Sequence, residues 1–159
     1  MERADRIINH ALFKEALDRV NKDEEGRIYC LHGFGHFMDV ARIGYIVILE
    51  KGLSIQKEIM YAAALLHDIG RFKQYEYGVP HDIAGGEIAG EILSDCGFSE
   101  AETELIVNAV TAHGRGLNEI TTLADVLAFA DRKSRMCMEC KAIDTCKWKR
   151  QDMNLSVEY

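Results

Sequence analysis

The sequence Leu-Leu-His-Asp-Ile-Gly, residues 65–70, places an imidazole and a carboxylate side by side after an apolar run over residues 59–66. Burying His67 and Asp68 at the end of a core helix costs free energy unless something compensates for their lost hydration. A divalent cation would compensate both, since neutral imidazole and carboxylate are ordinary ligands for such ions. Alternatively, His67 and Asp68 only cap the end of the helix. A two-residue motif alone does not decide between a metal site and a cap.

The composition is that of an ordinary globular domain. The chain has 159 residues, of which 48% are hydrophobic and 28% charged. We therefore expect one domain whose hydrophobic core is large enough to be stable without cross-links such as disulfides. The formal net charge is −7. General binders of nucleic acid polymers or anionic membranes are usually basic, so the charge argues against both. A small anionic substrate held by a metal and a few local cations stays compatible with it.

The sequence predicts neither export nor membrane insertion. The first six residues carry acids and no apolar segment follows them, unlike a signal peptide. The longest apolar runs, residues 43–49 and 59–66, are too short to cross a bilayer. We therefore expect a cytoplasmic protein. Its five cysteines, an odd number, are then thiols or ligands and not a disulfide framework.

Hydrophobic periodicity predicts an all-α fold, a single-domain bundle of about six helices. The chain has one proline, Pro80, and strand-like alternation is hard to find. Apolar residues at three- and four-residue steps predict helices over residues 4–23, 36–51, 55–67, 81–96, 99–113 and about 122–131. Residues 71–80 are expected to be a loop. The expected N-caps are Ser54, Asp82, Ser99 (with Glu102 in a capping box) and Thr121 or Thr122.

More histidines and aspartates share the position of the doublet, at helix ends or beside apolar helix faces. One such histidine alone is more often a structural residue. Helices that share one core would, however, bring these polar groups together, and several would stay unpaired unless a metal lay among them. The residues with this property are His36, His67 with Asp68, His81, His113 and Asp131.

The order of these residues resembles the HD-domain superfamily of metal-dependent phosphohydrolases. His36 precedes a Val-Ala pair by four residues, as in that family's first motif, His-x-x-x-Val-Ala. Residues 67–70 resemble the doublet that names the family, and Asp131, after an alanine and before a basic run, matches its last motif. The resemblance covers about residues 32–136 and implies an HD-like helical domain over residues 1–136. The Gly-Tyr-Pro element of the cyclic-dinucleotide branch is missing, so that activity is not implied.

The resemblance also implies a ligand set. A first divalent ion would be held by His36, His67, Asp68 and Asp131. The remaining two histidines, His81 and His113, match extra histidines of the two-metal branch, in which the aspartate of the doublet bridges both ions. We therefore expect two ions, which the sequence does not distinguish among Fe, Mn, Co, Ni, Mg and Zn. The expected nucleophile is metal-activated water, and we assign Asp68 and His67 to catalysis.

Cations near the motifs are candidates for binding a phosphate group. A monoester or anhydride needs about two of them, although each one alone has the alternative of a solvated loop residue. The candidates are Arg71 and Lys73 after the doublet, Arg115 after His113, and Arg132, Lys133 and Arg135 after Asp131. His32, in the turn before His36, contacts substrate, supports a ligand or is a plain loop residue.

The C-terminal tail, residues 137–159, is expected to pack on the same domain. Its cysteines Cys137, Cys140 and Cys146 have the spacing C-x-x-C-x5-C, which suits a small zinc or iron–sulfur site. A structural zinc site needs four ligands, and Cys30 completes the set only if the fold brings it near. The alternative is a tail packed through soft side chains.

The leading functional interpretation is a metal-dependent phosphohydrolase. We expect it to cleave a phosphate monoester, diester or anhydride of a small molecule, in particular a nucleotide. Two alternatives stay open: some members of the superfamily with the same six ligands are di-iron oxygenases, and a bundle of this kind can bind a nucleotide as a non-catalytic sensor. As partners we expect a small phosphorylated substrate and, as an option, further copies of the chain, but no nucleic acid polymer and no membrane.

Overall fold

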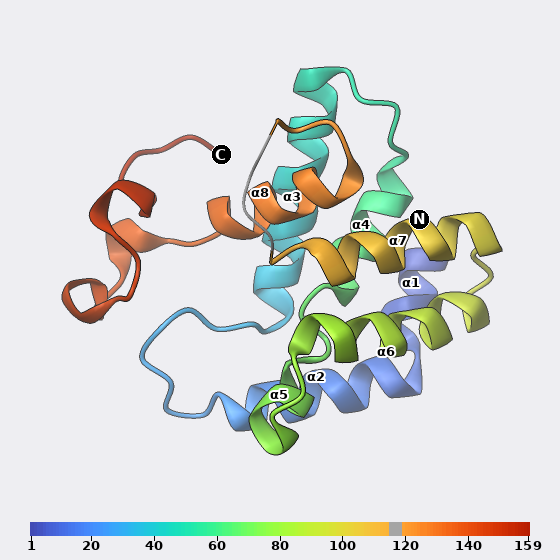
Figure 1. Cartoon of the computed structure of the whole chain (residues 1–159), viewed down its shortest axis with the longest axis horizontal. Coiled ribbons are helices and arrows are strands. Elements are labelled where there is room, and N and C mark those ends of the chain that lie inside the picture. The colour runs from blue at the N-terminus through green and yellow to red at the C-terminus, as the bar shows by residue number, and fades with distance from the viewer. Residues whose placement is uncertain (115–118) are drawn as a thin grey trace.

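Eight α-helices and three single-turn 3-10 helices make up the secondary structure of the computed structural model, which describes residues 1–114 and 119–159 (Figure 1). The all-α class is confirmed among the described residues. The α-helices are α1 Glu2–Asn9, α2 Ala11–Asp23, α3 Phe34–Lys51, α4 Lys57–Leu66, α5 Arg71–Tyr77, α6 His81–Asp95, α7 Glu100–Ala112 and α8 Leu123–Lys133. The 3-10 helices are η1 Cys137–Glu139, η2 Ile143–Thr145 and η3 Arg150–Asp152.

Helix α4 is the central element of the bundle and contacts α1, α3, α7 and α8. Its last five residues, 62–66, are all buried, and three of them are alanines that let neighbouring helices approach closely. At Gly44 of α3 an added Cβ would lie 2.4 Å from Met60 Cε, so α3 and α4 pack without room for a side chain there. The apolar run of the sequence is therefore the axis of the core, and its end delivers residues 67 and 68 to the interior.

Several helix boundaries agree with the sequence. Helix α3 ends at Gly52, whose φ of 64° is the left-handed conformation that glycine adopts readily. Helix α7 begins with the expected capping box, in which Ser99 and Glu102 bond each other's backbone N–H groups. Thr122 caps α8 in the same way. These signals are local, which is why the sequence alone contains them.

Three expectations about helices are wrong. The helix expected over residues 4–23 breaks at His10, whose backbone is extended and whose ring Nδ1 accepts a hydrogen bond of 3.2 Å from Leu12 N–H. Residues 71–80 are not all loop, because α5 forms there with Phe72 buried against the bundle. Helices α4 and α6 begin at Lys57 and His81, so neither Ser54 nor Asp82 is the expected cap.

The tail leaves the bundle after α8 and forms the three 3-10 turns (Figure 1). In residues 137–159 only Cys137 and Ala142 are buried. The end of the tail returns to the bundle, where the Tyr159 ring meets Phe129 edge-on at 5.7 Å. Among the described helices, none is long and apolar enough to pass through a bilayer.

Candidate metal centre

The ends of α3, α4, α6, α7 and α8 bring six imidazole and carboxylate side chains to one place in the bundle. His36 lies in the first turn of α3, His67 caps the end of α4, and Asp68 follows it directly. His81 is the first residue of α6, His113 caps the end of α7, and Asp131 lies near the end of α8. They form two groups whose ligand atoms lie within 4.8 Å of one another: His36, His67, Asp68 and Asp131 in one, and Asp68, His81 and His113 in the other.

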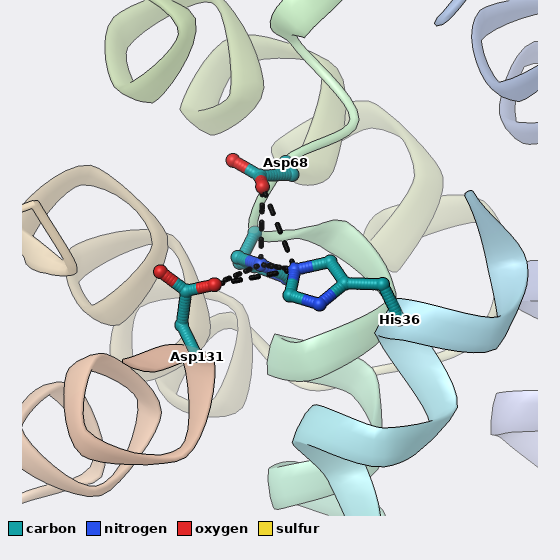
Figure 2. A group of neighbouring side chains, drawn as sticks. His36, Asp68 and Asp131 are labelled. Carbon is teal, nitrogen blue, oxygen red and sulfur yellow. Dashed lines mark hydrogen bonds and ion pairs between the residues drawn. The ribbon is translucent and has the colours of Figure 1, made fainter. Parts of the chain in front are cut away.

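The first group is drawn in Figure 2, where His36, Asp68 and Asp131 point toward one another. His36 Nε2 lies 3.2 Å from His67 Nε2 and 3.2 Å from Asp131 Oδ1. His67 Nε2 lies 3.4 Å from Asp68 Oδ2. Atoms bound at about 2.1 Å to one ion stand roughly 3.0–3.4 Å apart in octahedral or tetrahedral geometry. The spacing therefore suits a single divalent ion.

The second group uses the other oxygen of Asp68. His81 Nε2 lies 3.5 Å and His113 Nε2 3.6 Å from Asp68 Oδ1. Burial lowers the pKa of His81 to about 4 despite the nearby Asp68 charge, so its imidazole is neutral and can act as a ligand at neutral pH. Since Oδ2 faces the first group and Oδ1 the second, Asp68 belongs to both groups and could serve an ion held by either.

Each of the four histidines is held by its Nδ1 atom, which leaves Nε2 toward the centre. The partners of Nδ1 are the Ser134 hydroxyl for His36 (3.1 Å), the Ala64 carbonyl for His67 (2.7 Å), the Gln74 amide oxygen for His81 (2.6 Å) and the Val110 carbonyl for His113 (2.5 Å). An Nδ1–H that donates to an oxygen fixes the tautomer in which Nε2 has a free lone pair. This arrangement is typical of imidazoles that bind metals.

The electrostatics of the centre call for a cation. Both oxygens of Asp68 are buried and, in the described part of the chain, neither has a hydrogen-bond partner. Arg71 Nε lies 2.8 Å from Oδ2, but not at a hydrogen-bonding angle. Burial by itself would raise the pKa of Asp68, but the charges of His67 and Arg71 hold it well below its ordinary value. A buried carboxylate that stays ionised without hydrogen bonds is costly, and a divalent ion removes that cost.

The pKa of His67 also indicates that positive charge is favoured at the centre. Burial would lower its pKa, but Asp68 and Asp131 outweigh burial and raise it to about 9. The two carboxylates thus favour a positive charge beside them, which a bound cation supplies in place of the proton. The donor set, the orphaned Asp68 oxygens and the fixed tautomers all fit a pair of divalent ions.

A model of the HD domain matches residues 33–136 of the chain. The chain belongs to the HD-domain family. This is a family of metal-dependent phosphohydrolases, so the resemblance of the motifs is confirmed, and the two His/Asp groups sharing Asp68 are consistent with its two-metal branch.

Relatives of the HD-domain chain fall into two kinds. A protein of Clostridium beijerinckii, described as an uncharacterized protein, is 40% identical over 159 residues, which is the full length of both chains. Ribonuclease Y of Clostridium perfringens is 31% identical over 121 residues, 76% of this chain but 22% of the relative. Ribonuclease Y of Mycoplasma mycoides is 30% identical over 96 residues, 60% of this chain and 20% of the relative. The chain thus spans about a fifth of the ribonuclease Y relatives. No solved structure matches it significantly.

A cavity of about 960 Å³ opens beside the metal centre. It lies between the loop of residues 27–32 and the tail, and His36 and Asp131 belong to its wall. Among the expected substrate-binding residues, Arg71, Arg135 and His32 line it. Arg135 Nη2 is 2.5 Å from Asp131 Oδ1, so a guanidinium stands directly at the centre.

The other expected phosphate ligands lie elsewhere. Lys73 and Lys133 pair with Glu87 at 3.5 Å and Glu158 at 2.5 Å, and neither lines the cavity. Arg132 is exposed and also lies outside the cavity wall. Arg115 falls outside the described residues. The basic run after Asp131 therefore contributes one cation to the cavity, Arg135, which lies just beyond the end of α8.

His32 is not a plain loop residue, since it is buried and held by Glu24. The Glu24 carboxylate accepts hydrogen bonds from the His32 backbone N–H, from His32 Nδ1 and, at 2.7 Å, from the Tyr75 hydroxyl. Burial would raise the pKa of Glu24, but these hydrogen bonds lower it to about 2. His32 Nε2 then faces Asp68 Oδ2 at 3.8 Å. No local signal points to this role for Glu24, because it sits in an acidic stretch that is typical of a solvated turn.

Proposed function

We propose that this HD-domain chain hydrolyses a phosphate ester or anhydride of a small nucleotide, with two divalent ions at the centre. The observation that carries the proposal is Asp68, which presents one oxygen to each histidine group and has no hydrogen bond of its own among the described residues. When bound, such ions supply Lewis acidity toward phosphoryl oxygens and lower the pKa of coordinated water. The other parts of the reaction fall to the residues of the chain.

Arg71 and Arg135 are the residues that we assign to the phosphate group. Both line the cavity, and both now pair with carboxylates of the centre, Arg71 with Asp68 and Arg135 with Asp131. Cations bound by these carboxylates would take over the charge balance, so the guanidinium donors could turn to phosphate oxygens in the cavity. Guanidinium binds phosphate through two parallel hydrogen bonds, which also orients it for in-line attack.

Two features of the cavity support a nucleotide as the substrate. Its volume of about 960 Å³ is at the upper end of small-molecule sites. Tyr29 and Trp148 line it, and aromatic rings of this kind stack on nucleobases. The cavity thus offers arginines for a phosphate and aromatic rings for a base.

RNA is the competing substrate, because two of the relatives described above are ribonucleases by name. The net charge of −7 favours a small nucleotide, since polymer binding gains most of its affinity from basic surface. The test is a panel of nucleoside mono-, di- and triphosphates and cyclic nucleotides beside a short single-stranded RNA, each incubated with the Mn-loaded chain. Release of phosphate or nucleoside from the small substrates, with the RNA intact, is the expected result. Cleavage of the RNA alone would contradict the proposed substrate class.

The decisive variant is His67→Ala. In the Mn-loaded chain we expect the Mn content to fall to near zero and turnover to drop at least about 100-fold, because His67 bounds the first group and contacts Asp68. His10→Asn is the matched control, since it removes a histidine far from the centre and keeps a residue that can cap α2. If His67→Ala retained metal and turnover, the assignment would fail. Oxygen consumption by the iron-loaded chain, or nucleotide binding without turnover, would favour the oxygenase or the sensor instead.

The binding of a second ion is tested separately, with a variant of the second group. His81→Ala removes one ligand of the second group and none of the first. The Mn content of the Mn-loaded chain should then fall from two ions per chain toward one, while His67→Ala loses both. An unchanged stoichiometry in His81→Ala would show that this histidine serves the substrate and not an ion.

A further inference from the structure

Four of the five cysteines line the same cavity, although they come from distant parts of the sequence. They are Cys30, Cys137, Cys140 and Cys146. The fifth, Cys96, is buried at the end of α6 and does not belong to the cavity wall. The spacing C-x-x-C-x5-C lacked a fourth ligand in the sequence, and the fold brings Cys30 to the same space.

One tight turn separates Cys137 from Cys140, and two separate Cys140 from Cys146. Cys140 N–H donates to the Cys137 carbonyl at 3.2 Å, Ile143 N–H to the Cys140 carbonyl at 3.2 Å, and Cys146 N–H to the Ile143 carbonyl at 3.3 Å. Cys140 and Cys146 follow η1 and η2 with extended backbone. The turns shorten the path of the chain between the three cysteines, all of which line the cavity.

The loop of residues 27–32 is joined to the tail next to two of these cysteines. The Tyr29 hydroxyl donates to the Thr145 carbonyl at 3.2 Å. Cys30 follows Tyr29, and Cys146 follows Thr145, so this contact across 116 positions ties the loop that carries Cys30 to the tail segment that carries Cys146.

The tail has almost no core with which to hold this shape. Of residues 137–159 only Cys137 and Ala142 are buried. Three single-turn helices without an apolar core are the kind of segment that a metal commonly stabilises, because ligand binding replaces the missing hydrophobic free energy. Arg27, Lys141 and Lys147 also line the cavity, and their charges would offset those of bound thiolates.

We propose that Cys30, Cys137, Cys140 and Cys146 bind one zinc ion that fastens the tail to the loop of residues 27–32. Four thiols would each lose a proton to solvent, and four Zn–S bonds would form without any redox change. Among the described residues, ligand atoms gather within 4.8 Å only in the two groups at Asp68. The thiols must therefore draw together on binding. Cys30 is exposed and Cys140 and Cys146 are half-buried, so their side chains have room to rotate.

The proposed zinc site is separate from the proposed hydrolysis and can be detected by its own absorption. The full chain, reduced and loaded with Co²⁺, should show the intense near-ultraviolet charge-transfer absorption of cobalt bound to thiolates, which imidazole and carboxylate ligands do not produce. Titration of the zinc-loaded chain with a mercurial should release one zinc per chain as four thiols react. Both measurements use the unaltered protein, so they do not depend on whether a variant folds.

Variants assign the signal to these residues. The double substitution Cys137→Ser with Cys140→Ser, and Cys30→Ser alone, should abolish the cobalt–thiolate absorption and lower the zinc content by one ion per chain. Cys96→Ala, the matched control, should keep both. Absence of thiolate absorption in the cobalt-loaded chain would overturn the proposal. So would broad visible absorption with acid-labile sulfide that disappears in the same cysteine variants, because it would show an iron–sulfur cluster. Neither result would bear on phosphate release, which rests on the Asp68 centre.

Discussion

The bundle and the tail each bring distant ligand side chains together, but only the bundle sets them at ligand spacing. In the metal centre the side chains leave the ends of helices that share one core, and each imidazole is fixed by its Nδ1 hydrogen bond. In the tail the cysteines leave 3-10 turns that have little beneath them, and no three thiols lie within 4.8 Å in the described chain. Preorganisation of a site thus follows from the packing under it.

The bundle and the tail also differ in the free energy that holds them folded. The centre costs the bundle free energy, since it buries Asp68 and His67 completely, and the surrounding apolar core must offset that cost. The tail buries little and is joined to the bundle by exposed or half-buried hydrogen bonds and ion pairs. We therefore expect the tail to open without the bundle unfolding, as weakly packed segments do.

The largest expected effect separates the two regions by stability. Ile106 in α7 is fully buried, whereas Ile143 in the tail is half-buried. Ile106→Ala should lower the free energy of unfolding by about 2–5 kcal/mol, because it leaves a cavity in the core. Ile143→Ala should lower it by less than about 1 kcal/mol. Urea unfolding followed by circular dichroism measures both.

The pair is its own control, since both variants remove the same atoms from an isoleucine. An equally large loss in Ile143→Ala would show that the tail unfolds together with the bundle. In that case the two regions would form one cooperative unit, and the comparison would not hold.

The sequence predicted what local chemistry decides. The apolar run before His67, the glycine at residue 52 and the capping boxes of α7 and α8 are all read from neighbouring residues, and the structure contains each of them. The six side chains that meet in the two groups stand out in the sequence because they sit at helix ends or beside apolar helix faces. That pattern is visible without knowing how the helices pack.

What the sequence did not predict depends on contacts between distant segments. Helix α5 has seven residues and one buried side chain, Phe72, so tertiary packing and not propensity makes it helical. Glu24 is one of several acids in its stretch, and only the fold shows that it holds His32. The approach of Cys30 to the tail is likewise fixed by the path of the chain and by no local signal.

The next effect is confined to the tail. Asn154 Nδ2 donates to the carbonyls of Arg132 (2.7 Å) and Arg135 (2.9 Å), which ties the tail to the end of α8. Each hydrogen bond contributes about 0.5–1.5 kcal/mol net, so Asn154→Ala should raise the opening of the tail by roughly tenfold. Hydrogen exchange of the tail amides measures this, and the bundle amides should keep their protection.

Asn9→Ala serves as the control, since Asn9 Nδ2 donates to the Asp5 carbonyl within α1. It should leave tail exchange unchanged. If Asn154→Ala instead lowered protection throughout α4 and α7, the tail would contribute to the stability of the core.

The smallest effect is a dependence on pH that the bundle should show and the tail should not. Arg3 joins α1 to the first turns of α4 and α7, with Nε 2.9 Å from Glu58 Oε2 and Nη1 2.7 Å from Glu102 Oε2. The Arg3 hydrogen bond and the Ser99 N–H lower the pKa of Glu102 from 4.5 to about 2. A carboxyl with a lowered folded-state pKa stabilises the fold above its unfolded value, and that stability is lost as the pH falls from about 4.5 toward 2.

Glu102→Gln should therefore flatten the fall in the free energy of unfolding between pH 4.5 and 2. The loss of free energy of unfolding at neutral pH should stay below about 1 kcal/mol, because the pair is partly exposed and glutamine can still complete the capping box.

Glu158→Gln is the control in the tail. Lys133 lowers the pKa of Glu158, but this carboxyl is exposed on the tail, so its loss should leave the pH dependence of unfolding as it was. Urea midpoints of both variants at pH 6, 4 and 3 make the comparison. Equal slopes for Glu102→Gln and the unaltered chain would mean that Arg3 holds the three helices by packing on Phe98, over which its guanidinium lies at 4.2 Å, and not by charge.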